Sequence, residues 1–458
     1  MNTNIITEAA AFVDANAAVY DGIARDIWEH PEPAFREERS SAIYRERLAS
    51  RGFTVTEYPE MKYSFFAEKG AGGPIIAFMG EYDALPGMSQ ACAAEKKPLA
   101  EGAPGHACGH NLLGAGSLAA AETLARLLEA RGIPGRVRFY GCPAEEALGR
   151  IPMVKAGRFS DADAIMTWHG ADVNTPHRYT TSANLSLAFS FKGRASHAGM
   201  APQAGRSALD AVQLFNLALE FMREHLARDI LLHYVITDGG DRPNIVPAHA
   251  ATAMYLRAPT ADKIPAAFAR ILKAAEGAAL MTETSFTHEI KAGKCDYRPN
   301  DAIQDLLAQV MAEAPLPVPT EEELAFAAAL QATVDPEDRK ATLVPIGAPL
   351  GLLAAPLHGS VGDFGSGFRL GGSLDTGDVS YVVPVGQMNA ATWPLGVGAH
   401  TWQSCAASGG TWAFKAMRWA GLCMAAAGFR LASEPELLEA AKAEFKKAQV
   451  PYRSTMDM

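Results

Sequence analysis

Apolar residues recur at helical spacing near the start of the chain. In residues 5–27 they fall three or four positions apart, which predicts one amphipathic helix. Pro31 and Pro33 follow, so the helix is expected to end near His30. No basic stretch precedes an apolar one here, so a signal peptide is not expected. No run of about 18 apolar residues occurs in the chain, which argues against a membrane-spanning helix.

The next part of the chain alternates short apolar runs with a long Ala- and Leu-rich stretch. The runs at 74–80, 137–142 and 164–168 predict buried strands, and residues 112–131 predict a helix between the first two. This alternation predicts an α/β domain with a largely parallel sheet. Small or polar residues follow each predicted strand. Because ligands bind beyond the carboxyl ends of strands in such sheets, a functional site is expected there.

The pattern changes at about residue 183, where four strands and two helices follow in the order β-α-β-β-α-β. They are expected at residues 185–191, 206–225, 230–237, 250–257, 261–279 and 284–290. This is the order of a ferredoxin-like α+β unit. It predicts a second domain, residues 184–298, inserted into a discontinuous first domain of residues 1–183 and 299–458.

Two later segments carry weaker signals. Residues 313–363 are rich in Pro, Ala and acidic residues and predict no particular element. Residues 433–449 have the charge spacing of a surface helix, with Ser433 expected as its N-cap.

Composition and charge narrow the classes of function. The 458 residues are 48% hydrophobic and 20% charged, which is typical of a globular protein with two or three domains. The formal net charge of −10 argues against nucleic acid or an anionic membrane as a partner. Six cysteines are too few for a disulfide-stabilised scaffold of this length, so a reducing, cytoplasmic location is expected.

Side chains that bind metals or transfer protons gather at the predicted strand ends and in one later loop. They are Asp83, Cys108, His110, Glu145, Glu146, His169 and His400. Thiolate and imidazole donors suit zinc or another borderline ion. Adjacent glutamates point in different directions, so one can bind the metal while the other faces the substrate. The second carboxylate could then take a proton from metal-activated water and pass it to a leaving amine.

Each candidate also has an ordinary structural interpretation. A Cys-x-His pair can be accidental, adjacent glutamates are usually a solvated surface, and His169 could be a buried structural histidine. His358 lies in an equally glycine-rich loop and competes with His400. His106 could face the solvent or the substrate. Residues 114–121 (GAGSLAAA) imitate a dinucleotide-binding loop, but they lie inside a predicted helix, so no dinucleotide site is expected.

Longer motifs resemble a known family. They are GEYDALPG at 80–87, GHACGHN at 105–111, PAEEALGR at 143–150, WHG at 168–170 and GRASHAGMAPQAGRSALDA at 193–211. Together they resemble the metallo-amidohydrolases related to aminoacylases, carboxypeptidase G and auxin-conjugate hydrolases. Residues 371–404 resemble the branch that includes the B subunit of p-aminobenzoyl-glutamate hydrolase. The resemblance runs from His30 to about Gly410.

The resemblance implies a fold, a cofactor and a ligand set. The fold would be a zinc-peptidase-like α/β/α catalytic domain with a ferredoxin-like lid, and the cofactor would be two divalent ions (zinc, manganese or cobalt). The implied ligands are Cys108, His110, Glu146, His169 and His400. Glu145 would be the general base and acid, and Asp83 would orient a ligand. Many relatives have a metal-binding histidine at the position of Glu81, whereas the auxin-conjugate branch is acidic there.

The resemblance also assigns roles in the lid. His197 would polarise the scissile carbonyl in the active site of the partner subunit. Asn244 and Arg257 would contact the carboxylate end of the substrate. A homodimer through the lid is therefore expected, and a second, related subunit is a further possible partner. In the ordinary interpretation, His197 is only a turn residue and Arg257 only caps a strand edge.

The expected reaction is hydrolysis of the amide bond in small N-acyl or N-aroyl amino acids, including p-aminobenzoyl-glutamate-like and dipeptide-like substrates. Metal-activated water would attack, with Glu145 as base and acid. Two alternatives remain open. The same site could act as an aminohydrolase that releases ammonia from an activated aromatic amine. The chain could also be a metal-binding protein without catalysis, although such a protein would be expected to have lost Glu145 or a metal ligand.

Overall fold

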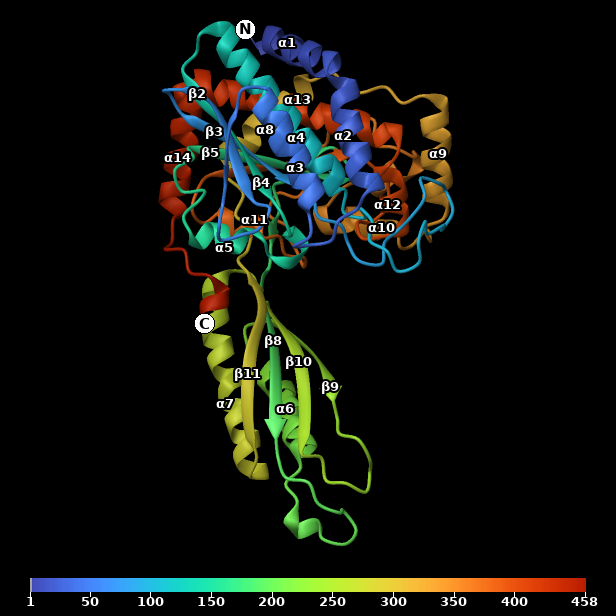
Figure 1. Cartoon of the computed structure of the whole chain (residues 1–458), viewed down its shortest axis with the longest axis vertical. Coiled ribbons are helices and arrows are strands. Elements are labelled where there is room, and N and C mark those ends of the chain that lie inside the picture. The colour runs from blue at the N-terminus through green and yellow to red at the C-terminus, as the bar shows by residue number, and fades with distance from the viewer. Residues whose placement is uncertain (1) are drawn as a thin grey trace. The chain divides into compact units, whose positions relative to one another are not determined.

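Seven strands form a mixed sheet at the centre of the larger of two units in this computed structural model, which describes residues 2–458 (Figure 1). In sheet order they are β1 (Thr54–Glu57), β2 (Phe65–Ala71), β4 (Gly135–Cys142), β3 (Ile75–Glu81), β5 (Ala164–Ala171), β13 (Val385–Ala391) and β6 (Thr175–Pro176). Strands β4, β3, β5 and β13 are parallel neighbours, whereas β2, β1 and β6 join in antiparallel pairs. The predicted α/β class is confirmed, with a mixed rather than a largely parallel sheet.

Long helices pack against this sheet and against one another. They are α1 (Asn2–Ala15), α2 (Ala17–Glu29), α3 (Glu38–Ser50), α4 (His110–Arg131), α8 (Asp301–Glu313), α13 (Thr411–Ser433) and α14 (Pro435–Ala448). Helix α4 contacts β3, β4, β5 and α13. Gly114 and Gly116 permit this approach, because an added Cβ would lie 2.6 Å from the Glu81 carbonyl oxygen or 2.7 Å from Trp168 Nε1, respectively. The GAGSLAAA run therefore serves helix packing.

The single helix expected over residues 5–27 is wrong, because the chain breaks at Asn16 between α1 and α2. The Asn16 side chain donates a hydrogen bond to the Phe12 carbonyl at 2.9 Å and accepts one from the Arg51 guanidinium at 3.0 Å. Asparagine side chains compete in this way with backbone hydrogen bonds of a helix. Helix α2 ends at Glu29, where the following prolines predict an end.

The expected N-cap at Ser433 is also wrong. Ser433 is the last residue of α13, and its hydroxyl donates to the Phe429 carbonyl at 2.8 Å. The C-terminal helix α14 begins two residues later at Pro435. Proline suits the first turn of a helix, because a backbone N–H at that position would have no hydrogen-bond partner within the helix.

The second unit contains an antiparallel four-stranded sheet and two helices, in the chain order that the sequence predicts. They are β8 (Ala183–Lys192), α6 (Ala208–Arg223), β9 (Leu231–Asp238), β10 (His249–Ala258), α7 (Ile264–Thr282) and β11 (Ser285–Lys294). The strand order is β11-β8-β10-β9, so β9 is an edge strand. Several apolar side chains on β9 are exposed.

The units are discontinuous in sequence. The first contains the residues up to Thr180, Arg298–Leu370 and Val379–Tyr452, and the second contains Thr181–Tyr297, Gly371–Asp378 and Arg453–Met458. The insertion expected at 184–298 starts three residues later and ends one residue later than the main segment of the second unit, and it lacks the two short extra segments. Asp378 holds one of them in place, because its carboxylate accepts a hydrogen bond from the Cys295 amide at 2.9 Å.

Residues 313–363, for which no element was predicted, include α9 (Glu321–Ala332). It begins with a capping box in which Thr320 and Glu323 exchange hydrogen bonds, a signature readable from sequence. The shorter elements of the chain are α5 (Arg150–Lys155), β7 (Thr180–Thr181), α10 (Lys340–Leu343), β12 (Arg369–Leu370), α11 (Thr376–Val379) and α12 (Trp402–Ser408). None of the helices in residues 2–458 has the length and hydropathy needed to cross a membrane.

Candidate metal centre

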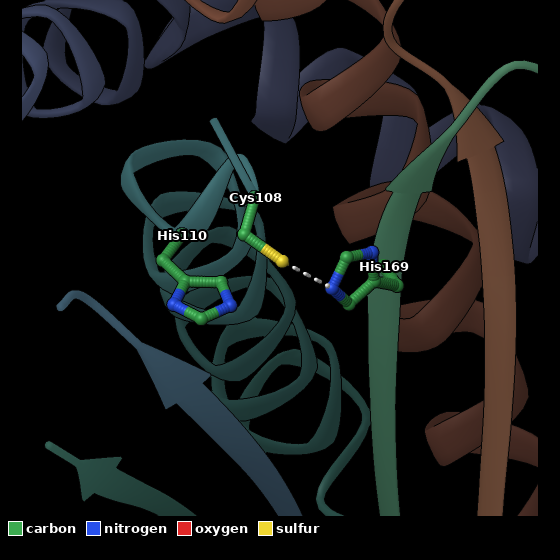
Figure 2. Close-up of side chains that lie close together, drawn as sticks. All are labelled: Cys108, His110 and His169. Carbon is green, nitrogen blue, oxygen red and sulfur yellow. Dashed lines mark hydrogen bonds between the residues drawn. The ribbon is translucent and has the colours of Figure 1, made fainter. Parts of the chain in front are cut away.

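Cys108 lies at the centre of a cluster of metal-binding side chains (Figure 2). Its Sγ is 3.4 Å from Nε2 of His169 on β5 and 3.2 Å from Nε2 of His400. Figure 2 shows His110, the first residue of α4, beside the thiol. Gly109, with φ of 74°, makes the left-handed turn between Cys108 and His110. A tight turn, a helix start and a strand end thus bring these side chains together.

Asp83 fixes the tautomer of His110. Its Oδ1 lies 2.8 Å from Nδ1 of His110, which must therefore carry the proton. The other ring nitrogen, Nε2, lies 3.1 Å from Oε2 of Glu81. Burial lowers the pKa of His110, but Cys108, Asp83 and Glu81 outweigh it and raise that pKa well above its usual value. The buried Arg150 guanidinium also pairs with Glu81.

Glu145 and Glu146 lie on a short, strained turn. Ala144 before them has φ of 55° and Leu148 after them has φ of 70°, which are unfavourable for residues other than glycine. The amide of Glu146 donates to Asp83 Oδ2 at 3.0 Å. The two carboxylates join different groups, as the sequence predicts for adjacent side chains. Ligand atoms of Glu146 lie with those of Cys108 and His400, and those of Glu145 lie with Glu81 and His110.

His400 also has a left-handed backbone, with φ of 62°. Its amide donates to the Ala107 carbonyl at 2.9 Å, which joins its loop to the segment that carries Cys108. The hydroxyl of Ser404 donates to the same carbonyl at 2.7 Å and belongs to a capping box whose N-cap residue, Thr401, precedes α12. Hydrogen bonds to Cys108 and Glu146 raise the pKa of His400 to about 10.

The donor set fits divalent cations of the zinc type. It supplies one thiol, three imidazoles and a carboxylate, within two groups whose ligand atoms lie no more than 4.8 Å apart. Cys108 belongs to both groups. Among the residues that the structure describes, buried His110 Nε2 and Glu146 Oε1 make no hydrogen bond of good geometry, and each lies near a charged group, Glu81 Oε2 at 3.1 Å and His400 Nε2 at 3.2 Å, respectively. Buried polar atoms are normally paired, so these two atoms are suited to an added cation.

Two other histidines have structural contacts instead. His106 is buried, and its Nε2 lies 3.1 Å from the Ile27 carbonyl, so the expectation that it faces solvent or substrate is wrong. Burial lowers the pKa of His106 to about 3. His358, the competitor of His400, accepts the Asn174 amide at Nδ1 at 2.9 Å and lies outside both groups.

The second unit carries the remaining predicted residues. His197 Nδ1 accepts the amides of Gly199 and Met200 at 3.2 and 3.1 Å, so a neutral ring has its proton on Nε2. The Ala198 amide donates to the Asn244 carbonyl at 2.9 Å, so the structure brings His197 and Asn244 together.

Arg257 lies elsewhere in that unit. It pairs with Asn184 at one end of the β8–β10 ladder, whereas His249 pairs with Lys192 at the other end. These ends are eight residues apart, or about 26 Å. The loop that carries Asn244 precedes the His249 end. The structure therefore does not bring Arg257 to the other two predicted lid residues.

Three residues that contact this site were not predicted from sequence. Arg150 pairs with Glu81, Ser404 supports His400, and Glu37 accepts the Ala144 amide at 2.7 Å. Glu37 and Arg150 have no recognisable signature of their own. Ser404 does lie three residues after Thr401, in a T-x-x-S sequence that can cap a helix.

Comparison with known proteins shows the family of the chain. The family model described as peptidase family M20/M25/M40 matches residues 77–367. The B subunit of p-aminobenzoyl-glutamate hydrolase from Escherichia coli (strain K12) is 38% identical over 449 residues, covering 95% of this chain and 93% of that protein. An Xaa-Arg dipeptidase from Mus musculus is 30% identical over 303 residues, covering 63% and 66%.

Solved structures share the fold. A putative aminohydrolase from methicillin-resistant Staphylococcus aureus aligns with a TM-score of 0.69 and 17% identity, covering 94% of this chain and 99% of that one. A dinuclear metal-binding M20 peptidase from Bacillus subtilis aligns with a TM-score of 0.60 and 17% identity, covering 92% and 99%. The predicted family resemblance and enzyme class are thus confirmed. The chain belongs to peptidase family M20/M25/M40 and is a metallohydrolase that acts on the C–N bond of amides.

Proposed function

We propose that this enzyme hydrolyses N-aroyl or N-acyl amino acids, with p-aminobenzoyl-glutamate-like conjugates as the first candidates and dipeptides as the second. The observation that carries the proposal is the convergence of the five predicted ligands, four of them around Cys108, with Glu145 beside them. The relatives support the substrate class, because one belongs to a p-aminobenzoyl-glutamate hydrolase and another is a dipeptidase.

Two divalent ions, of zinc, manganese or cobalt, are the proposed cofactor. Cys108, His110 and His169 would hold one ion, and Cys108, Glu146 and His400 would hold the other. When bound, the ions would polarise the scissile carbonyl and lower the pKa of water.

The protein side chains would supply proton transfer and orientation. The Glu145 carboxylate would take the proton of the attacking water and deliver it to the leaving amine. Asp83 accepts the Nδ1 proton of His110 in a hydrogen bond, so Nε2, which faces Glu81, would be the nitrogen that binds a cation. His197 would donate its Nε2 proton to the developing oxyanion, and Arg257 would bind the substrate carboxylate through its two-pronged guanidinium.

The separation of the lid residues supports a proposed homodimer. A small substrate cannot contact His197 and Arg257 of one chain, because about 26 Å separates the ends of the ladder near which they lie. We therefore place His197 and Asn244 of one copy at the active site of a second copy. Exposed apolar residues on the edge strand β9 and on α6 offer a surface for this contact. They are Leu217, Phe221, Leu231, Val235 and Ile236.

The test combines metal analysis with product analysis. Purified enzyme is expected to release p-aminobenzoate and glutamate from p-aminobenzoyl-glutamate. Glu145→Gln should retain the metal but lower kcat about 1,000-fold, because it cannot accept a proton. Liquid chromatography of products and elemental analysis of the protein measure the two effects. Release of ammonia would instead support the aminohydrolase alternative, and near-normal turnover of Glu145→Gln would exclude its proposed role.

The need for a second, different chain is checked in the same assay. The A subunit of p-aminobenzoyl-glutamate hydrolase from Escherichia coli (strain K12) is also related, at 30% identity over 226 residues. The homodimer proposal requires that this chain alone be active. Activity that appears only after a homologue of that second protein is added would contradict it.

A further inference from the structure

Glu37 is a buried carboxyl residue beside the turn that carries Glu145. It lies just before α3, and none of its surface is exposed to solvent. Its Oε1 accepts the backbone amide of Ala144 at 2.7 Å. The sequence separation is 107 residues, so this bond joins two distant parts of the first unit.

Carboxyl groups hold the backbone on both sides of Glu145. Glu37 accepts the amide before it, from Ala144, and Asp83 accepts the amide after it, from Glu146. Ala144 needs such support, because its φ of 55° is costly for a residue with a Cβ. The turn closes with a hydrogen bond from the Gly149 amide to the Ala144 carbonyl at 2.7 Å.

The segment that presents Glu37 is itself anchored to the active site. The Ala84 amide, one residue beyond Asp83, donates to the Glu32 carbonyl at 2.8 Å. Pro33 and Ala84 form an isolated β-bridge, and Phe35 reverses the chain with φ of 68°. Glu37 therefore has a fixed position relative to the end of β3, from which Asp83 extends.

We propose that Glu37 is a positioning residue for the general base: its carboxyl group fixes the Ala144 amide and thereby the direction of the Glu145 carboxylate. The inference rests on the role proposed above for Glu145. Proton transfer requires an alignment that a displacement of about 1 Å can destroy, at a cost of about 100-fold in rate. A purely structural Glu37 would alter stability without selectively altering kcat.

Two substitutions of Glu37 distinguish the effect of side-chain length from the effect of charge. Glu37→Gln retains an oxygen acceptor at the same distance, and Glu37→Asp retains the carboxyl group but withdraws it by one methylene. Burial and the neighbouring Asp83 raise the pKa of Glu37 to about 7, so an uncharged amide is a close replacement. Glu37→Ala removes the acceptor altogether.

Glu32→Ala is the matched control. The Glu32 carboxylate accepts the amides of Arg39 and Ser40 at the start of α3, at 2.9 and 2.8 Å, and it holds no part of the Glu145 turn. Its backbone contact with Ala84 survives the substitution. The control should lower the melting temperature and leave kcat unchanged.

With p-aminobenzoyl-glutamate as substrate, Glu37→Ala should lower kcat about 100-fold, with KM and bound metal nearly unchanged. Glu37→Gln should recover most of this loss and Glu37→Asp should not.

Hydrogen exchange of the Ala144 amide, which does not depend on activity, should accelerate in the alanine variant. Normal kcat in Glu37→Ala would overturn the proposal, and so would unchanged exchange. If Glu37→Ala does not fold, the kcat values of Glu37→Gln and Glu37→Asp are compared instead. A Glu37→Asp variant as active as Glu37→Gln would overturn the proposal.

A double substitution distinguishes failure of this inference from failure of the proposed function. Because Glu37 acts through Glu145, adding Glu37→Ala to Glu145→Gln should cause no further loss of kcat. A full additional loss would show that Glu37 acts by another route and overturn the proposal. Normal turnover of Glu145→Gln alone would instead exclude the role of Glu145, whatever Glu37 does.

Discussion

At the scale of single residues, the pKa values of the histidines differ according to what surrounds each ring. Burial opposes the charge on His169, but the Cys108 thiol outweighs it and raises the pKa of His169 to about 9. For His106 and His358 burial prevails, lowering pKa values to about 3 and about 4. Burial also raises the pKa of Cys108, yet His110 and His169 lower it to about 6. The side chains of the cluster thus favour a thiolate, which is the ligand form of cysteine.

His358 provides a test at this scale. Its folded-state pKa of about 4 lies below the unfolded value of 6.5, so the unfolded state binds the proton first as pH falls. The contribution to stability is complete above pH 6.5 and is lost as pH falls toward 4, on the order of 3 kcal/mol. In His358→Asn, whose Oδ1 can still accept the Asn174 amide, this dependence should vanish. Urea unfolding of the metal-free proteins between pH 4 and 7 measures it, and parallel curves would contradict the assignment.

At the scale of elements, the contact of α4 with β3 couples the fold to the site. Helix α4 begins with His110, and β3 ends at Glu81, two residues before Asp83. Gly114 holds the two elements close, because a Cβ there would lie 2.6 Å from the Glu81 carbonyl oxygen. A change in this spacing would separate His110 from the residue that orients it.

Gly114→Ala is therefore expected to destabilise the protein by about 1–3 kcal/mol and to lower its metal affinity. Gly22→Ala in α2 is the matched control, because a Cβ added there would have no atom within 4 Å. That variant should be more stable by up to about 1 kcal/mol, since alanine favours a helix over glycine. Urea unfolding and zinc titration measure the two effects. Equal stability of the two variants would contradict the packing argument.

At the scale of the whole molecule, the proposed exchange of His197 between copies can be tested with mixed dimers. A dimer of one His197→Ala chain and one Glu145→Gln chain contains one complete site if His197 acts in the partner's site. Such dimers, purified through two different tags, should recover about half of the wild-type turnover. If His197 acts within its own chain, neither site is complete and activity should stay at the level of the parent variants. Light scattering should confirm the dimeric mass.

The local pattern of apolar and polar residues predicted most of the helices and strands. It failed where contacts between distant residues determine the end of an element or the bounds of a unit. The strands and helices of the second unit follow the predicted order because side-chain periodicity is a local property. The break at Asn16 and the end of α13 at Ser433 depend on side-chain hydrogen bonds that periodicity does not reveal. The segments 371–378 and 453–458 join the second unit through contacts with residues far away in sequence.

The sequence by itself determined the family, the order of elements and the ligand types, because residue chemistry and periodicity are written along the chain. Only the tertiary structure decided that His400, rather than His358, lies at Cys108, since 292 positions separate His400 from the thiol. It alone placed Glu37 at the Ala144 amide and separated Arg257 from His197. The physical reason is that a metal site is made of side chains whose proximity depends on packing, and packing joins residues that no local pattern relates.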